Sequence, residues 1–425
     1  LFSAALPEAD SFMITMAALG ERIILQSDWD QVLKDNEGKV WLSYKVTGRP
    51  TVHGELQTQG LSEEGYPYVM GSNGFSVLEV NKQKIRVTYL KDAACCTRKF
   101  IAADTTFSSV HKPRKSIHSL DVTPGGLGVS SDSEGKLKIW QTENGEVRRN
   151  LEGHYGDVYS CRFFPTGIVV LSAGSDMQVK IWSAETGQCA ATLIGHKGAI
   201  LDTAIVDRGR NIVTCGRDGT ARLWDVGQQS CLGTFSECGG DVNSCCLAHT
   251  SQDVDLGNPD SPPSNSFIHH FYFKSCDREI STEGKLLLLG CENGTLKGYG
   301  LQSRKKVFEL PCHSAVNCCC FLSEVSVVCG TQDGYITVTD IRNYRLPLKE
   351  WKENRYAVLS LLPNAGGFFA STGDGSCFFV DGNFQTTTEF TGSDCDHLYK
   401  IAIDGTHLYT ACRDGQIRKY RLNLL

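Results

Sequence analysis

The sequence predicts an all-β protein: a seven-bladed β-propeller preceded by a small β-rich N-terminal domain. Seven times along the chain a short apolar strand runs into a polar turn, usually Asp-Gly, and the next strand ends in an aromatic residue or its positional equivalent. These end positions are Trp140, Trp182, Trp224, Tyr299, Thr339, Val380 and Tyr420. Successive positions are 40 to 42 residues apart, except for one interval of 75 residues. A period of roughly 40–45 residues with a terminal aromatic residue and Asp is typical of four-stranded propeller blades.

The N-terminal part of the chain lies outside this period. We expect the natural start at Met16 and a disordered upstream extension at residues 1–15. Acidic residues such as Glu8 and Asp10 interrupt its apolar run, which argues against a secretory signal. Residues 16–92 contain strand-like runs separated by glycine-rich turns, among them VWLSYKV, FSVLEV and KIRVTYL. This pattern predicts a small β-rich domain.

The propeller is predicted for residues 97–425, with a loop insertion in one blade. The chain ends soon after Tyr420, so the last blade has no residues of its own for an outer strand. An open ring would expose a strand edge, and we therefore expect a strand near 98–112 to complete the last blade. The long interval places the insertion near residues 249–284, a stretch rich in Pro, Ser and Asp. Its FIHHFYF patch (Phe267–Phe273) is either a docking peptide or an insertion without function.

Polar residues recur at fixed places in the blades and predict a buried hydrogen-bonded chain. One set is His154, Ser172, Asp176 and Trp182, and a second is His196, Thr214, Asp218 and Trp224. His111 and Trp140 begin a third set one blade earlier. A buried imidazole and a buried indole N–H need hydrogen-bond partners, which a hydroxyl and a carboxylate supply. A catalytic triad would occur once, so recurrence indicates a structural role.

The remaining composition favours a protein-binding scaffold. Cys161, Cys245 and Cys319 each stand three residues after a repeat-equivalent valine, as expected for small core residues in a reducing compartment. No Cys-x-x-Cys spacing indicates zinc, and no phosphate loop, HExxH or GxSxG motif indicates an enzyme. We expect no cofactor or metal. The net charge of −6 argues against nucleic-acid binding, and no apolar run is long enough for a membrane span. We expect a cytoplasmic monomer that also enters the nucleus.

The amino-acid sequences of several repeats are similar to those of one protein family. The segments GLGVSSDSEGKLKIW, GHKGAILDTAIVDRGRNIVTCGRDGTARLWD, GTQDGYI and GDGSCF resemble the proteasomal ATPase-associated factors, which are WD-repeat proteins. The resemblance runs from about Met16, through QSDW (Gln26–Trp29), to Leu425. It is weaker in the N-terminal domain and departs at the FIHHFYF patch.

This resemblance implies a non-enzymatic assembly chaperone for the base of the proteasome regulatory particle. Such a protein binds the C-terminal domains of the AAA ATPase subunits and restrains their premature association with the core particle. Other assembly chaperones of the regulatory particle are further candidate partners. The alternative is a substrate receptor of a cullin-type ubiquitin ligase, since residues 339–342 (Thr-Asp-Ile-Arg) form a degraded copy of the aromatic-Asp-x-Arg box of those receptors.

Candidate partner-binding residues lie after the Gly-His pairs and before the Asp-Gly turns, positions that tend to point to one face of a propeller. They are Tyr155, Asp157, Lys197, Arg217, Asp241, Gln332, Arg355, Tyr356 and Arg413, with Asp394 and Asp396 from the last blade. Tyrosine and arginine are favoured anchors, and carboxylates would complement a basic ATPase tail. The alternative reading for several of them is a solvated loop residue.

Overall fold

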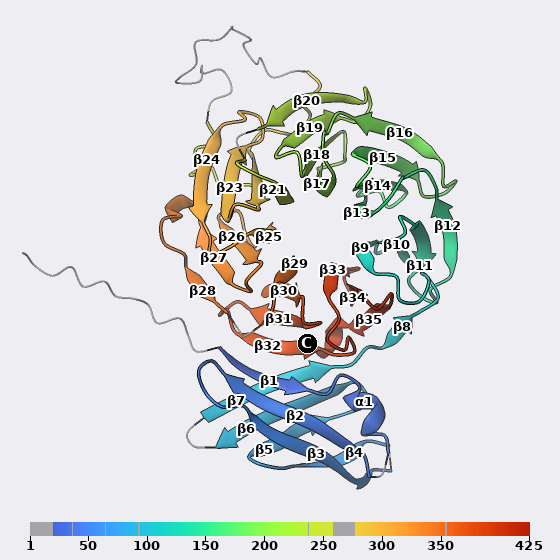
Figure 1. Cartoon of the computed structure of the whole chain (residues 1–425), viewed down its shortest axis with the longest axis vertical. Helices are drawn as coiled ribbons and strands as arrows, with labels where there is room; N and C mark the ends of the chain where they lie inside the picture. The colour runs from blue at the N-terminus through green and yellow to red at the C-terminus, as the bar shows by residue number, and fades with distance from the viewer. Residues whose placement is uncertain are drawn as a thin grey trace, which may run out of the picture.

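The computed structural model describes residues 20–425 except for residues 36, 64, 92–93, 237, 258–276 and 353–354. The predicted extension at residues 1–15 and the FIHHFYF patch lie outside the described residues. Figure 1 shows a ring of β-sheets around a central axis, with a smaller β structure packed against one side of the ring. The predicted fold class, a β-propeller with a β-rich N-terminal domain, is confirmed.

Seven groups of four strands form the blades, which we number in chain order. In Figure 1 the first strand of each blade lies nearest the axis and the fourth lies on the outside. Blades 1 to 3 consist of β9 (Ile117–Val122), β10 (Leu127–Asp132), β11 (Leu137–Gln141) and β12 (Val147–Leu151); β13 (Val158–Phe163), β14 (Val169–Gly174), β15 (Gln178–Ser183) and β16 (Cys189–Ile194); and β17 (Ile200–Val206), β18 (Asn211–Gly216), β19 (Ala221–Asp225) and β20 (Ser230–Phe235). Blades 4 to 6 consist of β21 (Val242–His249), β22 (Lys285–Cys291), β23 (Thr295–Gly300) and β24 (Lys306–Pro311); β25 (Val316–Phe321), β26 (Ser326–Thr331), β27 (Ile336–Asp340) and β28 (Lys349–Trp351), with the 3-10 helix η1 (Ile341–Asn343) after β27; and β29 (Val358–Asn364), β30 (Gly367–Thr372), β31 (Cys377–Asp381) and β32 (Thr386–Phe390).

Blade 7 combines both ends of the propeller sequence. Its first three strands are β33 (Leu398–Ile403), β34 (His407–Cys412) and β35 (Ile417–Arg421), followed by the 3-10 helix η2 (Leu422–Leu424). Its outer strand is β8 (Thr105–Phe107), which pairs antiparallel with β35 in the register Ile417↔Phe107. The ring is therefore closed by a strand that lies more than 300 residues from its partner in sequence, and β35 has no free edge.

The N-terminal domain consists of two sheets, and the second is continuous with blade 6. β1 (Glu21–Leu25), β2 (Lys39–Val46), β3 (Val52–Leu61) and β4 (Pro67–Gly71) form the first sheet, with a short helix α1 (Trp29–Val32) between β1 and β2. β5 (Phe75–Val80), β6 (Lys84–Lys91) and β7 (Ala94–Ile101) form the second. β7 also pairs in parallel with β32, so one seven-stranded sheet runs from blade 6 into the N-terminal domain. Residues 98–101 thus belong to this junction, and only β8 completes blade 7.

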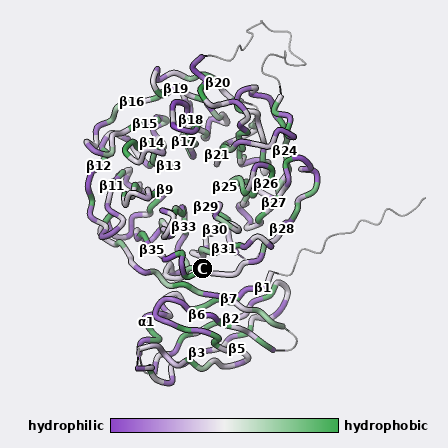
Figure 2. Tube along the Cα trace, turned by 180° about the vertical axis from the view of Figure 1, so that it is seen from behind, coloured by the Kyte–Doolittle hydropathy of each residue, from purple (hydrophilic) through white to green (hydrophobic). Residues whose placement is uncertain are grey.

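Burial differs between the two parts of the molecule, as their sequence patterns require. All six residues of β18 are buried, because a blade strand is covered by neighbouring blades on both faces. On β3 Gly54, Leu56 and Thr58 are buried and alternate with more exposed residues, because that strand covers the core on one face only. Figure 2 shows hydrophobic stretches along the blade strands and largely hydrophilic connecting loops.

The cysteines fill positions in this core. Cys161, Cys245 and Cys319 are buried on the first strands of blades 2, 4 and 5. The cysteines of the described residues are all free thiols. A small, slightly polar side chain suits the narrow space where the first strands converge on the axis.

Candidate protein-binding site

A buried side-chain network ties the loops of blades 2 and 3 to their strands. In blade 3 the Trp224 indole N–H donates to Thr214 Oγ1 (2.9 Å), and Thr214 Oγ1 lies 2.7 Å from His196 Nε2. His196 Nδ1 lies 2.8 Å from Asp218 Oδ2. An indole only donates and a carboxylate only accepts, so a neutral imidazole with its proton on Nδ1 satisfies every member of the chain. Blade 2 repeats the arrangement with His154, Ser172, Asp176 and Trp182.

Blade 1 completes the same network with two residues that the sequence analysis had not assigned. His111 Nδ1 lies 2.9 Å from Asp132, and its Nε2 lies 2.7 Å from Ser130 Oγ. The Trp140 N–H donates to Ser130 Oγ at 3.0 Å. Ser130 could have been found, because it stands ten residues before its tryptophan, as Ser172 does. Three consecutive blades thus share one device, which is a structural role rather than a catalytic one.

The network also fixes the backbone of the loops that carry candidate anchors. The backbone N–H of Tyr155 donates to Asp176, and that of Lys197 donates to Asp218. Burial raises the pKa of the Asp176 carboxyl, but hydrogen bonds from His154 and from backbone N–H groups outweigh burial and hold that pKa below its usual value. The carboxylate therefore stays ionised and keeps its hold on the loop at neutral pH.

The loops before each first strand and the turns between second and third strands lie at the same end of every blade, because the strands of a blade are antiparallel. We call the surface that they form the upper face. Nearly all candidate binding residues reach solvent there. Exposed side chains are Tyr155, Lys197, Arg217, Gln332, Tyr356, Asp394 and Arg413, and half-buried ones are Asp157, Asp241 and Asp396. Tyr155 and Tyr356 are the most open anchors, with 81% and 71% of their surface exposed.

Arg355 differs from the other candidates. Its side chain is only 2% exposed and points inward, where it donates to Glu389 at 2.6 Å and lies over the ring of Phe378. An arginine held in this way supports the surface from below and does not present its guanidinium to a partner. Arg355 is therefore not one of the surface residues that could contact a partner.

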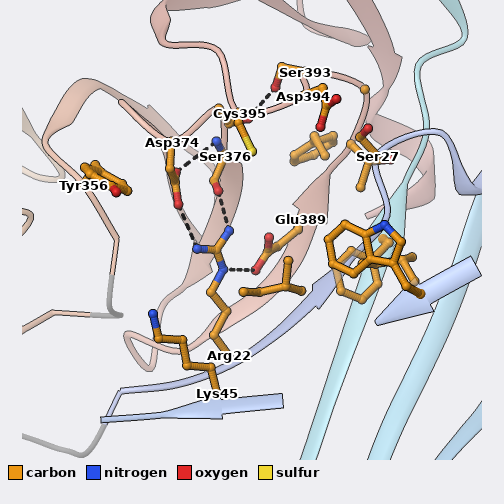
Figure 3. A pocket seen from close by; sticks show the side chains of 18 residues that line it. Arg22, Ser27, Lys45, Tyr356, Asp374, Ser376, Glu389, Ser393, Asp394 and Cys395 are labelled. Carbon is orange, nitrogen blue, oxygen red and sulfur yellow. Dashed lines mark hydrogen bonds and ion pairs between the residues drawn. The ribbon is translucent and has the colours of Figure 1, made fainter. Parts of the chain in front are cut away.

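A cavity of about 280 Å³ opens between the N-terminal domain and blades 6 and 7. Figure 3 shows Arg22 of β1 at its centre, between Asp374 and Glu389 of blade 6. Arg22 donates to Asp374 at 2.8 Å and to Ser376 at 2.5 Å, and its Nε lies 3.7 Å from Glu389. The Trp29 indole N–H donates to Thr391 nearby, at 2.9 Å. These contacts join two parts of the chain that are more than 350 residues apart.

Electrostatics at this junction are balanced. Burial raises the pKa of Asp374, but the charges of Arg22 and Arg355 outweigh it and hold that pKa well below the usual range. The same two guanidiniums lower the pKa of Glu389 in the same way. Two buried guanidiniums thus face the buried carboxylate of Glu389 and the half-buried carboxylate of Asp374, and the four charges offset one another.

The rim combines both parts of the molecule. Tyr356 and Asp394 line it from the propeller, and Trp41 and Lys45 of β2 line it from the N-terminal domain. Trp41 is 50% exposed, so the N-terminal sheet presents an aromatic side chain at the rim of the cavity, as the propeller does with Tyr356. Trp41, Lys45 and Arg22 could not be assigned to this site from the sequence, because they lie outside the repeat and no local signal links them to blade 6.

Comparison with known proteins shows the family of this chain. Residues 145–183, 187–225 and 304–340 match the family described as WD domain, G-beta repeat. Proteasomal ATPase-associated factor 1 of Homo sapiens is 51% identical over 400 residues, which cover 94% of this chain and 98% of the relative. The chain belongs to the proteasomal ATPase-associated factor 1 family. The Gallus gallus member is 52% identical over 399 residues, with the same coverage of both chains. A Dictyostelium discoideum relative, named a probable proteasomal ATPase-associated factor 1, is 36% identical over 419 residues, covering 94% of this chain and 96% of its own.

The described residues also bear on metal sites and membrane spans. Within residues 20–257 and 277–425, apart from the short gaps, no three His, Cys, Asp or Glu side chains gather as metal ligands would. No helix in the described part of the chain has the length and apolar character needed to cross a membrane.

Proposed function

We propose that this protein is a non-catalytic scaffold that binds AAA ATPase subunits of the proteasome through its upper face. The main support is the similarity, along 94% of the chain, to relatives named as proteasomal ATPase-associated factors. The upper face suits such binding. Its exposed Tyr155 and Tyr356 are residues of the type that dominates protein interfaces, and the buried networks hold its loops in place, so binding requires little ordering.

We further propose that the bound part is the C-terminal domain of an ATPase subunit and that binding restrains association with the core particle during assembly of the regulatory particle base. A scaffold that covers a surface of the subunit competes with every other partner for that surface, and this needs no turnover. Asp394, which lines the cavity between the N-terminal domain and blade 6, and Asp396 two residues later supply negative charge toward a basic segment.

A binding experiment distinguishes this function from its alternative. The full chain is immobilised and tested against each isolated ATPase C-terminal domain and against a cullin adaptor. Selective retention of one or two ATPase domains would support the proposal. Retention of the adaptor alone would favour a ubiquitin-ligase receptor, although the arginine of its degraded box, Arg342, is paired at 2.6 Å with Asp340 of the same box.

The upper face can be tested by substitution. We expect Tyr356→Ala and Asp394→Asn each to weaken ATPase binding roughly tenfold, the loss expected when an interface anchor contributes about 1.4 kcal/mol. Titration calorimetry with the domain retained in the first experiment gives the two affinities. Both residues line one cavity rim, so the double variant also shows whether they act on one partner segment.

Leu346→Ala is the matched control. Leu346 is 72% exposed and follows η1, where the loop between third and fourth strands lies on the opposite face. Its replacement should leave the affinity unchanged. Affinities that are equal in all five proteins, the wild type and the double variant included, would exclude the cavity rim as the binding surface.

A further inference from the structure

Blade 5 carries cysteines where blade 3 carries the polar pair of its buried network. Cys312 stands four residues before the start of its first strand, as His196 does in blade 3. Cys329 occupies on β26 the place of Thr214 on β18, ten residues before the end position of the third strand. That end position is Thr339, so blade 5 also lacks the tryptophan. Two thiols have therefore replaced a hydrogen-bonded imidazole and hydroxyl.

The two sulfur atoms are in contact. Cys312 Sγ lies 3.8 Å from Cys329 Sγ and also 3.8 Å from the carbonyl oxygen of Leu310. A disulfide bond is about 2.05 Å long, so its formation requires the sulfurs to approach by less than 2 Å. The residues are 17 apart in sequence: Cys312 lies in the loop between β24 and β25, and Cys329 lies on β26.

The two thiols differ in access. Cys312 is half-buried and lines a surface cavity of about 440 Å³ together with His313, Tyr344 and Glu350. Cys329 is fully buried behind it. A small oxidant can therefore reach Cys312 through the surface cavity, and the Cys329 sulfur lies in contact with Cys312 on the buried side. The hydrogen bond with Cys329 lowers the pKa of the Cys312 thiol despite its burial, which favours the reactive thiolate.

Other thiols do not share this arrangement. Cys238 occupies the histidine position of blade 4 and is near Cys291, but both are fully buried. Burial also raises the pKa values of Cys318 and Cys320 on the neighbouring strand, which makes them poor nucleophiles. Cys245 lines another cavity and interacts with Cys215, but these two residues are at most 2% exposed, whereas Cys312 is half-buried, lines a surface cavity and contacts a partner thiol.

We propose that Cys312 and Cys329 are a redox-active dithiol that a peroxide oxidises to a disulfide. The Cys312 thiolate attacks one oxygen of hydrogen peroxide and breaks the O–O bond. This gives a sulfenic acid, and the departing hydroxide takes up a proton to become water. The Cys329 sulfur then attacks the Cys312 sulfur, the S–S bond forms, and the sulfenic oxygen leaves as a second water. Two thiols lose two electrons and two protons, and one peroxide becomes two water molecules.

The disulfide would link the loop between β24 and β25 to β26, next to the turn that carries Gln332 on the upper face. A cross-link between loop and strand would take the place of the His–Thr hydrogen bond of blade 3. The proposal concerns the chemistry of blade 5 alone and stands independently of what the upper face binds.

Peptide mapping of the full chain tests the proposal. Reduced protein is treated with hydrogen peroxide, remaining thiols are blocked, and the chain is cleaved after glutamate without reduction. Cleavage at Glu309, Glu324 and Glu350 puts Cys312 and Cys329 on separate peptides, residues 310–324 and 325–350. We expect these two peptides as one cross-linked species, lighter by two hydrogen atoms than their sum and separated again by dithiothreitol.

Because Cys318, Cys319 and Cys320 share the first peptide, variants assign the bond. Cys312→Ser and Cys329→Ser should each abolish the cross-link, whereas Cys320→Ala should retain it. The thermal midpoint provides a second readout: oxidation should raise it in the wild type, since a cross-link limits the unfolded chain, and should not raise it in either serine variant.

Several results would overturn the proposal. One is a cross-link that persists in Cys312→Ser, which would place it on another thiol of the same peptide. Another is peroxide treatment that oxidises exposed thiols such as Cys189 while residues 312 and 329 stay unlinked. Should a serine variant fail to fold, the wild-type map still decides, because elastase cleavage after Ala315 or Val316, between Cys312 and Cys318, puts Cys312 on a peptide without the three other thiols.

Discussion

Replacing Trp224 by alanine should destabilise the protein by about 3–5 kcal/mol, the cost typical of removing a large buried aromatic side chain. Trp224 is 1% exposed and packs with Ile200 and Ile212 in the core between blades 2 and 3. Its loss also removes the indole N–H that donates to Thr214 Oγ1, which weakens the link to His196. The shift of the guanidinium unfolding midpoint, followed by circular dichroism, measures this loss.

Two further variants separate packing from hydrogen bonding. Trp224→Phe keeps a ring but removes the indole N–H, so it should fall between the wild type and Trp224→Ala. Trp41→Ala removes an indole that is half exposed at the cavity rim, and we expect a change within about 0.5 kcal/mol, as for most surface substitutions. Equal losses for Trp41→Ala and Trp224→Ala would contradict a role for the buried network in blade stability.

Features that repeat could be read from the sequence, because each blade is an independent copy of one pattern. Ser130, Ser172 and Thr214 all stand ten residues before their tryptophan, and the hydrogen-bonded chain follows from that spacing. Asp132 is harder to find. It stands eight residues before Trp140, because it is the last residue of β10, whereas the equivalent aspartates of blades 2 and 3 lie in the turn and stand six residues before their tryptophans.

Features that depend on contacts between distant segments could not be read in this way. A strand that completes blade 7 follows from the need to close the ring, and β8 fills that place. Closing the ring does not require the parallel pairing of β7 with β32, and no local sequence pattern indicates that pairing. Parallel neighbours are chosen by the packing of whole sheets, which a period in one segment does not reveal.

The candidate site shows the same division. The repeat period placed Tyr155 and Lys197 on exposed loops, because it fixes where each loop enters its blade. The same period predicts an exposed position for Arg355, which stands three residues before its strand as Lys197 does. Its side chain is buried instead, because it pairs with Glu389 and packs on the ring of Phe378. A buried carboxylate that needs a cation can override the direction that the repeat suggests.

Arg22→Ala should cost about 3–5 kcal/mol, the loss typical of breaking a buried ion pair from one side. The side chains of Arg22 and Glu389 are less than 10% exposed, so solvent cannot replace the missing guanidinium. Asp374 would lose its closest cation and Ser376 a hydrogen-bond donor. Guanidinium unfolding measures the change, and limited proteolysis of the native protein shows whether the N-terminal domain loosens from blade 6.

The effect should depend on pH in a defined direction. Arg22 holds the pKa of Asp374 below its unfolded value, so the ion pair stabilises the fold at neutral pH and this contribution is lost as the pH falls through the folded-state pKa. In Arg22→Ala only Arg355 remains to oppose the effect of burial, so the pKa of Asp374 rises. The difference in stability between the wild type and the variant should therefore be largest near pH 7 and should shrink below about pH 4.

Arg342→Ala supplies a matched control, because Arg342 pairs with Asp340 at 2.6 Å on the exposed surface. Water screens that pair, and its removal should cost far less than the removal of Arg22 and should leave the proteolysis pattern unchanged. Similar losses for the two variants would mean that the junction is screened like an open surface. A large loss for Arg22→Ala alone would mean that Arg22 of β1 stabilises blade 6 as a buried residue of the blade itself would, and that the N-terminal domain is held to the propeller by this ion pair.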